Sequence, residues 1–513
     1  MYKKNKNIFL FFIIIFSIYC SLIIGVSWDE LFHHELGLIT LNYLLSLGKI
    51  YPEEKILLSE IYSPMYWTIS AFFSKMLPSK FEVQVIHLIN LTFSISTIFG
   101  ISKISKELFN AKVGKIVFLL CFFYPIFFGH MSINGKDTIL AFSNVWITYS
   151  ILKYLKKQQI SKKRNTCLFV IGFASALGTG IQMLFLGSLI PIILFVAIEI
   201  FFVKKIISKK FCVRKLLVDI LKTFLIFYIL LIIFWIDKHP NIFILPFKFF
   251  MEILSLNITP GLPIVLMNGH FYFTFDNPSK FYLLTNLFFK TPEFFLLLYF
   301  IFFFIIIKNN NFYIKKFDNF IYNLILILSI LVFANLIVLI IPYPIYDGLR
   351  LFLWLIPYFC IVPGLAIYFL VSNLKNKKIK IVFIGVNILA TFYLINFFLL
   401  TPYQYTYLNI FNGKPSNHSK KFENDYWGVS IKELIRKNNL QFKNNTKVAV
   451  CGANSEAIKK YFKKFKSINV NFVSYEESEY ILMTNKVAYD NESISNLSKA
   501  KTCYDKFEGI NIS

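Results

Sequence analysis

The sequence predicts an all-α polytopic membrane protein with about eleven transmembrane helices and a small α/β region at its C-terminal end. Two features of the composition favour this class: 56% of the 513 residues are hydrophobic, and the mean hydropathy is +0.60. A soluble core does not absorb that much apolar surface. The third feature is the pattern, because apolar runs long enough to cross a bilayer alternate with short lysine-rich segments.

The first apolar run covers residues 8–26 and follows Lys3, Lys4 and Lys6. Its length and the lack of a small-x-small cleavage site favour a retained helix over a signal peptide. A turn at residues 178–180 leaves open whether the two short spans beside it are one irregular span. The other predicted spans are residues 83–101, 113–131, 137–155, 167–182, 184–203, 216–236, 291–307, 320–342, 350–372 and 379–400.

Lysine-rich segments give the orientation of the chain, because all of them fall on one side when the spans are counted alternately. By the positive-inside rule this side, with the N-terminus, is the cytoplasm. The chain then divides into a transmembrane domain, residues 1–400, and an extracytoplasmic C-terminal region, residues 401–513. The lysine-rich segments are residues 103–115, 153–164, 204–215, 308–316 and 374–380.

Two long segments of the transmembrane domain are predicted to be external, at residues 28–80 and 237–290. The first contains two amphipathic patches, near 35–48 and 65–77. We expect these patches to form helices that lie in the plane of the membrane surface.

The net charge of +26 comes from 54 basic and 28 acidic residues. In a soluble protein this charge would suggest nucleic-acid binding. Here the basic residues lie in short loops between apolar runs, which is typical of topology signals and of contacts with anionic lipids. We therefore expect membrane lipids, and no nucleic acid, as partners.

The C-terminal region has the pattern of a small α/β unit. KVAVCGAN predicts a strand and a turn, NSEAIKKYFKKF a helix, and NVNFVSY and YILMTN two further strands. The seven cysteines show no CxxC and no Cys/His spacing suited to zinc. Cys451 and Cys503 both lie in this region, where a disulfide and two free thiols are both open.

Charged residues at the predicted external ends of the spans are the candidates for chemistry. Acidic groups at a membrane boundary are costly to keep charged unless they are paired or hydrated, so they suggest a functional site. Carboxylates with cationic partners suit a reaction that removes a proton from an acceptor and neutralises a phosphate leaving group. The four groups are Asp29 and Glu30 with His33 and His34; Lys136 with Asp137; His270, Asp276, Lys280 and Lys290; and Asp347 with Arg350.

Plainer interpretations exist for the charged residues. Asp29 and Glu30 could be ordinary solvated loop charges. Asp137 could serve only to stabilise the start of its helix, where a negative charge is favoured. Arg350 could be an interfacial anchor that reaches toward water.

The histidines have plainer interpretations too. His33 and His34 are adjacent, so on a helix they point about 100° apart and do not easily share one metal ion. We therefore predict no metal site there. His270 lies among aromatic residues, where a packed or interfacial histidine is the more common case.

Several short elements appear in a recognisable order. WDELFHHELGLITLNYLLSLGK places an acidic pair before a helix that ends at glycine, and a Pro-x-Tyr-Trp element with Tyr66 follows. KDTILAF begins a later helix with an acidic residue. The KTP element at 290–292 is intact, and Arg350 is followed by Pro357.

This order resembles the polyprenol-phosphate-sugar-dependent glycosyltransferases of the C-type membrane fold, in particular the bacterial relatives of protein O-mannosyltransferases and of the lipid A aminoarabinose transferase. The resemblance covers residues 28–430. The turn SALGTGIQM departs from it, because the lysine that this family has after the glycine is missing. That departure puts in doubt any phosphate contact from this turn.

The resemblance implies that the chain is a glycosyltransferase of the bacterial inner (cytoplasmic) membrane. The donor would be a sugar on a polyprenyl phosphate, and the acceptor would be a glycan, a lipid or a protein. Asp29 would be the general base in an inverting transfer at the extracytoplasmic face. Glu30 and Asp137 would position the acceptor or the sugar, and Arg350, with Lys136 and Lys290, would neutralise the phosphate.

His33, Tyr66 and His270 complete the set of candidate substrate-binding residues. No nucleotide or metal is strictly required by this reaction, because a neutralised lipid phosphate is already a good leaving group; dependence on a divalent metal stays open. An unperturbed aspartate is a weak base, so we expect an apolar setting or the neighbouring Glu30 to raise the pKa of Asp29.

Two other functions fit a polytopic, aromatic-rich chain. A transporter or flippase of lipid-linked glycans would be expected to carry charges near the midpoints of its spans. An O-antigen polymerase or ligase would be expected to depend on arginines and a histidine in one large external loop. The polar residues here lie at the external ends of the spans, with an acidic pair in the first loop, which favours the glycosyltransferase.

The predicted orientation can be tested with reporters fused after Ser513. An alkaline phosphatase fusion should be active and a green fluorescent protein fusion dark, because an odd number of spans places this end outside the cytoplasm. The opposite pattern would contradict the count of eleven spans.

Overall fold

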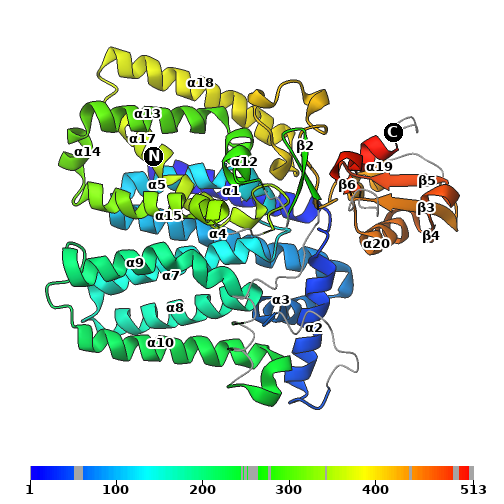
Figure 1. Cartoon of the computed structure of the whole chain (residues 1–513), viewed down its shortest axis with the longest axis horizontal. Coiled ribbons are helices and arrows are strands. Elements are labelled where there is room, and N and C mark those ends of the chain that lie inside the picture. The colour runs from blue at the N-terminus through cyan, green and yellow to red at the C-terminus, as the bar shows by residue number, and fades with distance from the viewer. Residues whose placement is uncertain are drawn as a thin grey trace.

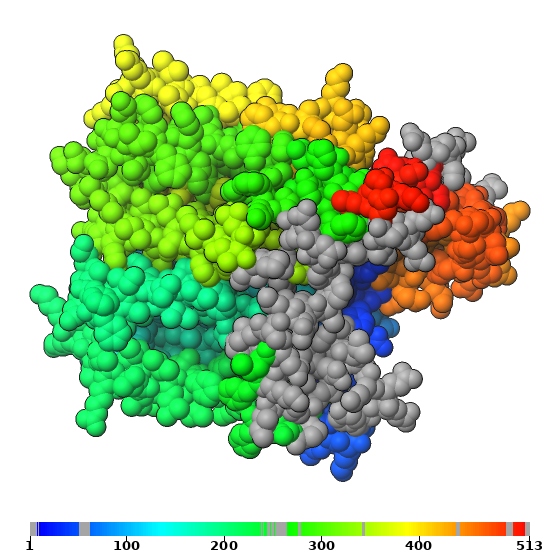
Figure 2. Space-filling model, viewed as in Figure 1, coloured from blue at the N-terminus to red at the C-terminus, as the bar shows by residue number. Residues whose placement is uncertain are grey.

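The computed structural model describes residues 2–50, 62–243, 247, 251, 264–274, 279–340, 344–437, 442–488 and 496–507. Most of these residues are helical. Figure 1 shows a bundle of helices that run side by side, with α2, α3 and a small α/β unit at one end. Figure 2 shows the same C-terminal unit, in orange and red, projecting from that end of the bundle.

Each predicted span contains one of the bundle helices. The bundle helices are α1 (Tyr2–Ile23), α4 (Glu82–Leu108), α5 (Ala111–Phe122), α7 (Asp137–Lys157), α8 (Ser161–Ile181), α9 (Ile190–Ile198), α10 (Val213–Phe234), α13 (Glu293–Asn309), α15 (Phe320–Ile340), α17 (Ile361–Ser372) and α18 (Lys377–Leu399). Residues 178–180 belong to the last turn of α8, and the break that separates α8 from α9 begins at Gln182, so the two spans are separate helices.

Five of the helical segments are long and apolar enough to cross a membrane by themselves, and a bent pair formed by α12 (Tyr282–Lys290) and α13 makes a sixth among the residues described. Of the others, α7 and α8 are long enough but more polar, and several are short and lie beside a proline. Pro125 opens α6 (Pro125–His130), and Pro357 lies in α16 (Ile356–Phe359). The fold is therefore that of a helical membrane protein, and the count of eleven spans stays a prediction.

Large apolar side chains cover the outside of the bundle as well as its inside. Leu217 on α10, Ile321 on α15 and Phe392 on α18 are among many that are more than half exposed. A soluble protein rarely exposes so much contiguous apolar surface, whereas a lipid-facing surface requires it.

The first external segment contains α2 (Glu30–Leu45) and α3 (Met65–Lys75), at the predicted amphipathic patches. The two helices approach closely at Gly37, where a Cβ atom would collide with the backbone carbonyl of Trp67. The indole of Trp67 in turn donates a hydrogen bond to the carbonyl of Gly135, 3.1 Å away. These contacts fix the start of α2 against the segment that precedes α7.

The second external segment is described in part. It contains a hairpin of β1 (Ile264–Met267) and β2 (His270–Phe273), followed by α12. The hairpin turn at Asn268 and Gly269 has positive φ at both residues, which is the backbone that an Asn-Gly pair favours. Asp276 lies outside the described residues.

The C-terminal unit is built on a three-stranded parallel sheet. β3 (Thr446–Cys451) lies between β4 (Val470–Phe472) and β5 (Tyr480–Met483), and α20 (Ser455–Lys466) joins β3 to β4. These elements lie where the sequence predicts them. The remaining elements of the unit are α19 (Ile431–Lys437), β6 (Val487–Ala488), β7 (Lys501–Thr502) and α22 (Cys503–Lys506).

Cys451 and Cys503 form a disulfide, which decides between the two states that the sequence left open. The other five cysteines are free thiols, and four of them are buried. The bond ties the end of β3 to the start of α22.

Thiol counting tests this assignment. Protein denatured without a reductant should bind maleimide at five cysteines, and at seven after reduction. The C503S variant should bind six without reduction, because it frees Cys451. Seven labels on the unreduced wild type would show that the disulfide is not formed.

Candidate functional site

Arg350 is the centre of the candidate site, because three carboxylates surround its guanidinium group. Its Nη2 donates to Asp29 Oδ2 at 3.2 Å, its Nε to Asp137 Oδ2 at 3.1 Å, and its Nη1 to Asp347 Oδ2 at 2.7 Å. The side chains of Arg350, Asp137 and Asp347 are almost completely buried, whereas that of Asp29 is 36% exposed. Asp29 is thus the most exposed member of this cluster.

The three carboxylates come from distant parts of the chain. Asp29 precedes α2, and Asp137 is the first residue of α7, where the helix dipole favours a negative charge. Asp347 sits in a turn with φ of +56°, next to Gly348 with φ of +67°, directly before Arg350. The arginine therefore joins the first external segment, the start of α7 and the late loop 344–349.

The C-terminal region supplies an aromatic ring that packs against the arginine. The Arg350 guanidinium carbon lies 4.2 Å from the centre of the Trp427 ring, a cation–π contact. The Trp427 indole faces Nδ1 of the buried His130 at 3.4 Å, and the Tyr426 hydroxyl lies 2.6 Å from Nε2 of the same histidine. The site is consequently incomplete without residues beyond the last bundle helix.

Asn134 links His130 to the carboxylates. Its amide nitrogen donates to Asp137 Oδ2 at 2.9 Å and lies 3.1 Å from His130 Nδ1. Its amide oxygen accepts the backbone N–H of Asp137 at 2.9 Å. Asn134 therefore fixes both the rotamer of Asp137 and the first turn of α7.

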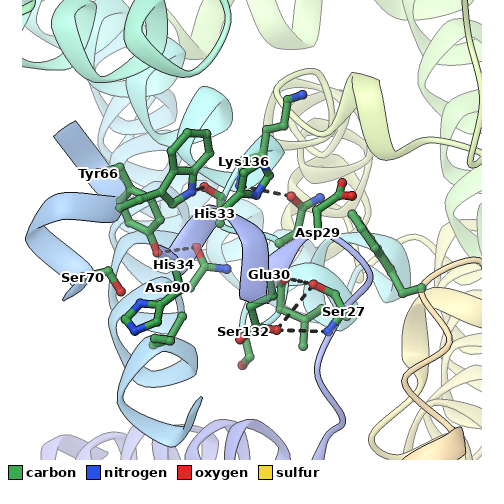
Figure 3. A pocket seen from close by; sticks show the side chains of 16 residues that line it. Ser27, Asp29, Glu30, His33, His34, Tyr66, Ser70, Asn90, Ser132 and Lys136 are labelled. Carbon is green, nitrogen blue, oxygen red and sulfur yellow. Dashed lines mark hydrogen bonds between the residues drawn. The ribbon is translucent and has the colours of Figure 1, made fainter. Parts of the chain in front are cut away.

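A small polar cavity lies beside Asp29 (Figure 3). It is lined by Glu30, His33, Tyr66 and Lys136 among others, and its volume of about 20 Å³ suits about one water molecule. The Tyr66 hydroxyl donates to Asn90 Oδ1 at 3.0 Å, so it is already committed inside the protein.

A much larger cavity lies on the other side of Asp29. Its volume is about 410 Å³, within the range of small-molecule sites. The bundle side of its wall includes Trp28, Asp29, Asp347 and Arg350. The C-terminal region supplies the rest of the wall, with Tyr426, Trp427, Val450, Cys451, Gly452, Tyr475 and Lys486 among its residues.

The prediction that the pKa of Asp29 is raised is wrong. Burial raises the pKa of this carboxyl, but the positive charges of Arg350, Lys136 and Lys486 outweigh it and hold the pKa below its usual value. Asp29 is therefore a carboxylate at neutral pH and a weak base in this state.

Glu30 does not supply the neighbouring negative charge that was expected. Its Oε1 lies 2.9 Å from His87 Nε2, and its Oε2 accepts the backbone N–H of Ser27 at 3.0 Å. In Figure 3 its carboxylate points toward Ser27, away from that of Asp29. The adjacent carboxylates have separate partners.

His33 and Lys136 both lie close to Asp29, as the sequence suggests. The His33 ring stacks on Trp67 with centroids 4.1 Å apart, and burial lowers the pKa of His33 to about 3, so the ring is neutral. His34 turns elsewhere and pairs with Glu82 at 2.7 Å. The Lys136 ammonium donates to the Tyr62 hydroxyl at 3.1 Å.

The two candidates of the 268–292 segment behave differently. Lys290 is buried next to the Asp347–Gly348 turn, with its ammonium 5.4 Å from the centre of the Phe422 ring. His270 is exposed at the tip of the β1–β2 hairpin and lines neither cavity. The structure thus brings Lys290 near the cluster and leaves His270 outside it.

Sequence reasoning named Asp347 among the charged candidates without giving it a role, and it missed Asn134, Trp427 and Lys486. A role for Asp347 could have been assigned, because a DG turn three residues before an arginine places a carboxylate beside it. Asn134 precedes the acidic start of a helix and was a detectable cap-like signal. Trp427 and Lys486 had no local signal, since only the docking of the C-terminal region brings them to Arg350.

Comparison with known proteins adds the fold. No protein-family model matches the chain, and no curated protein matches it. Two crystal structures of ArnT from Cupriavidus metallidurans match it over most of both chains. The apo structure has a TM-score of 0.52 at 10% identity and covers 92% of this chain and 86% of ArnT.

The second ArnT structure, bound to undecaprenyl phosphate, has a TM-score of 0.53 at 10% identity, with coverage of 93% and 87%. The chain shares the fold of ArnT. An oligosaccharyltransferase from Archaeoglobus fulgidus is also similar, with a TM-score of 0.45 at 11% identity over 89% of this chain and 64% of its own. The fold shared with ArnT is the one that the resemblance in the sequence suggested.

Replacing Arg350 tests how much it contributes to the stability of the protein. Arg350→Met should lower the stability of the purified protein by about 3–5 kcal/mol, because it leaves buried carboxylates without their cation. Thermal unfolding in detergent would measure the loss. Arg436→Met, at an exposed arginine of α19, is the matched control and should change little; an equal effect of both variants would contradict a central role for Arg350.

Proposed function

We propose that this protein is a membrane glycosyltransferase that moves a sugar from a polyprenyl phosphate to an acceptor hydroxyl at the extracytoplasmic face. The observation that carries the proposal is the position of Asp29. Its partly exposed side chain contacts the buried Arg350 and lines a cavity of about 410 Å³. The shared fold with ArnT, which was crystallised with undecaprenyl phosphate, supports the class of donor.

Asp29 acts as the general base in this proposal. It takes the proton of the acceptor hydroxyl while the acceptor oxygen bonds to the anomeric carbon of the sugar. The bond between that carbon and the lipid phosphate breaks on the opposite face, so the configuration inverts. The products are the glycosylated acceptor and the free polyprenyl phosphate.

Arg350 neutralises the phosphate and also controls Asp29. A guanidinium has five N–H donors, and the three carboxylates take three of them, which leaves one on each terminal nitrogen. A phosphate bound there would share the positive charge with Asp29. The arginine would then stabilise the carboxylate less, so the pKa of Asp29 would rise and its basicity would increase.

Lys136 and Lys290 are the second and third cations of the phosphate site in this proposal. Lys136 lines the small cavity beside Asp29. Lys290 is buried, and no carboxylate lies within 4 Å of its ammonium among the residues described. Two point charges beside an arginine fork suit a phosphate monoester or diester.

Glu30, His33, Tyr66 and Asp137 act on the substrate indirectly. Asp137 holds Arg350, and the others shape the small cavity next to Asp29. No nucleotide or metal enters the proposed steps, because the lipid phosphate leaves once it is neutralised. We propose the bacterial cytoplasmic membrane as the location, with residues 401–513 outside the cytoplasm.

Lipid mass spectrometry of a deletion strain tests the function. The strain should accumulate a sugar-phosphate lipid and an under-decorated envelope product. Wild-type protein should reverse both changes, and Asp29→Asn should reverse neither, because an amide cannot accept the proton. The variant should still be inserted at wild-type abundance.

Glu35→Gln is the matched control, because Glu35 is an exposed carboxylate in α2, the helix that Asp29 directly precedes. It should restore the wild-type lipid profile. Restoration by Asp29→Asn would contradict the general-base role, and an unchanged lipid profile in the deletion strain would contradict the proposed function.

A further inference from the structure

The parallel sheet of the C-terminal unit directs the ends of its strands at the large cavity. Val450 and Cys451 end β3, Lys486 follows β5, and Tyr475 follows β4; all four line the cavity opposite Arg350. In open parallel sheets, ligands bind in the crevice outside the carboxyl ends of the strands, where neighbouring connections run to opposite sides. β3 lies at such a point, with β4 on one side and β5 on the other.

Lys486 and Asp347 form an ion pair in the wall of this crevice that is too long for a hydrogen bond. The Lys486 ammonium is 3.6 Å from Asp347 Oδ1, which is beyond hydrogen-bond distance. Oδ1 is buried and has no hydrogen-bond partner among the described residues. Buried polar atoms are normally paired, so an orphaned oxygen at a cavity wall indicates a missing water or ligand.

The Lys486 ammonium also has donors to spare. One of its three N–H groups reaches the carbonyl oxygen of Tyr426 at 3.3 Å. A group that both donates and accepts could lie in the cavity beside the pair and contact both. It would accept a hydrogen bond from Lys486 and donate one to Asp347 Oδ1. A hydroxyl does this, whereas a second carboxylate or a phosphate could not donate to Asp347.

An aromatic ring borders the same place. The Trp28 side chain is 38% exposed, and its ring centre lies 5.2 Å from the Lys486 ammonium. The backbone carbonyl of Trp28 accepts a hydrogen bond from Asn454 at 3.0 Å, which holds this residue against the C-terminal unit. A partly exposed ring beside a donor and acceptor pair is a surface for the apolar face of a sugar ring.

The position of Lys486 is fixed by its neighbours. Its carbonyl accepts the backbone N–H of Cys503 at 2.8 Å, and Cys503 is bonded to Cys451. Gly452 has φ of +76°, and a Cβ atom there would come within 2.9 Å of the Lys486 Cβ. The loop after β3 thus needs glycine to admit Lys486 to the cavity.

We propose that the crevice between Asp347, Lys486 and Trp28 binds a sugar residue through one of its hydroxyl groups. This inference rests on the proposed function and names the C-terminal unit as a sugar-binding half of that site. The sugar belongs either to the donor lipid or to the acceptor glycan, since both carry hydroxyls.

Kinetics of Lys486→Met test the inference. The full-length protein in nanodiscs would be supplied with the sugar-phosphate lipid extracted from the deletion strain and with the under-decorated envelope fraction of the same strain. Loss of a charged hydrogen bond should raise one KM roughly tenfold or more, with a smaller change in kcat. A higher donor KM assigns the sugar to the donor, and a higher acceptor KM assigns it to the acceptor.

Binding of undecaprenyl phosphate, which has no sugar, is the internal control. Lys486→Met should bind it as the wild type does, whereas a purely structural role for Lys486 would weaken it as well. Lys432→Met is the matched variant, because Lys432 is a partly buried lysine of this unit that, like Lys486, donates to a backbone carbonyl, that of Ile24 at 2.7 Å.

Lys432→Met should leave both KM values unchanged. Unchanged KM values in Lys486→Met, or equal losses of undecaprenyl phosphate binding and transfer, would overturn the inference. A wild-type protein that transfers no sugar at all would instead overturn the proposed function.

Discussion

The site depends on one cation that must neutralise three carboxylates. Arg350 contacts Asp29, Asp137 and Asp347, and two of these are fully enclosed. Buried carboxylates without a cation would be too costly to keep ionised, so the arginine requires the three segments to meet. The first external segment, the start of α7 and the loop 344–349 are therefore held together electrostatically at one end of an otherwise apolar bundle.

The three carboxylates around Arg350 differ in their surroundings. Asp137 is fixed by Asn134 and holds the arginine, whereas Asp347, fixed by its left-handed turn, holds the arginine with one oxygen and turns the other toward Lys486. Asp29 lies at the edge, with the small cavity on one side and the large one on the other. In the proposed reaction, the lowered pKa of Asp29 in this state requires the substrate to change the electrostatics before this carboxylate becomes a strong base.

The positions of the helices could be predicted from the sequence, because only an apolar run of sufficient length can cross a bilayer. The meeting of Asp29, Asp137 and Arg350 could also be predicted, since all three fall at the same ends of their spans. The divergence of Asp29 and Glu30 was missed although its cause was known: successive residues on a helix point about 100° apart. The argument applied to His33 and His34 applies equally to this acidic pair.

The contributions of the C-terminal region lay beyond sequence reasoning for a different reason. Trp427 and Lys486 lie 398 and 457 residues after Asp29. The contact of Trp427 with Arg350 and the charge effect of Lys486 on Asp29 arise from docking rather than from any local pattern. The strands β3 and β5 could be predicted, but not that their ends face Arg350. The helices and strands of this unit can be predicted from a single sequence, but the part of the bundle against which they pack cannot.

The placement of Trp427 under Arg350 has a consequence for biogenesis. The three carboxylates lack their cation until the chain has been made as far as Arg350, so a shorter polypeptide carries unneutralised acidic groups at its outer ends. The ring beneath the arginine comes later still, and a polypeptide truncated before Trp427 would carry Arg350 without this aromatic contact.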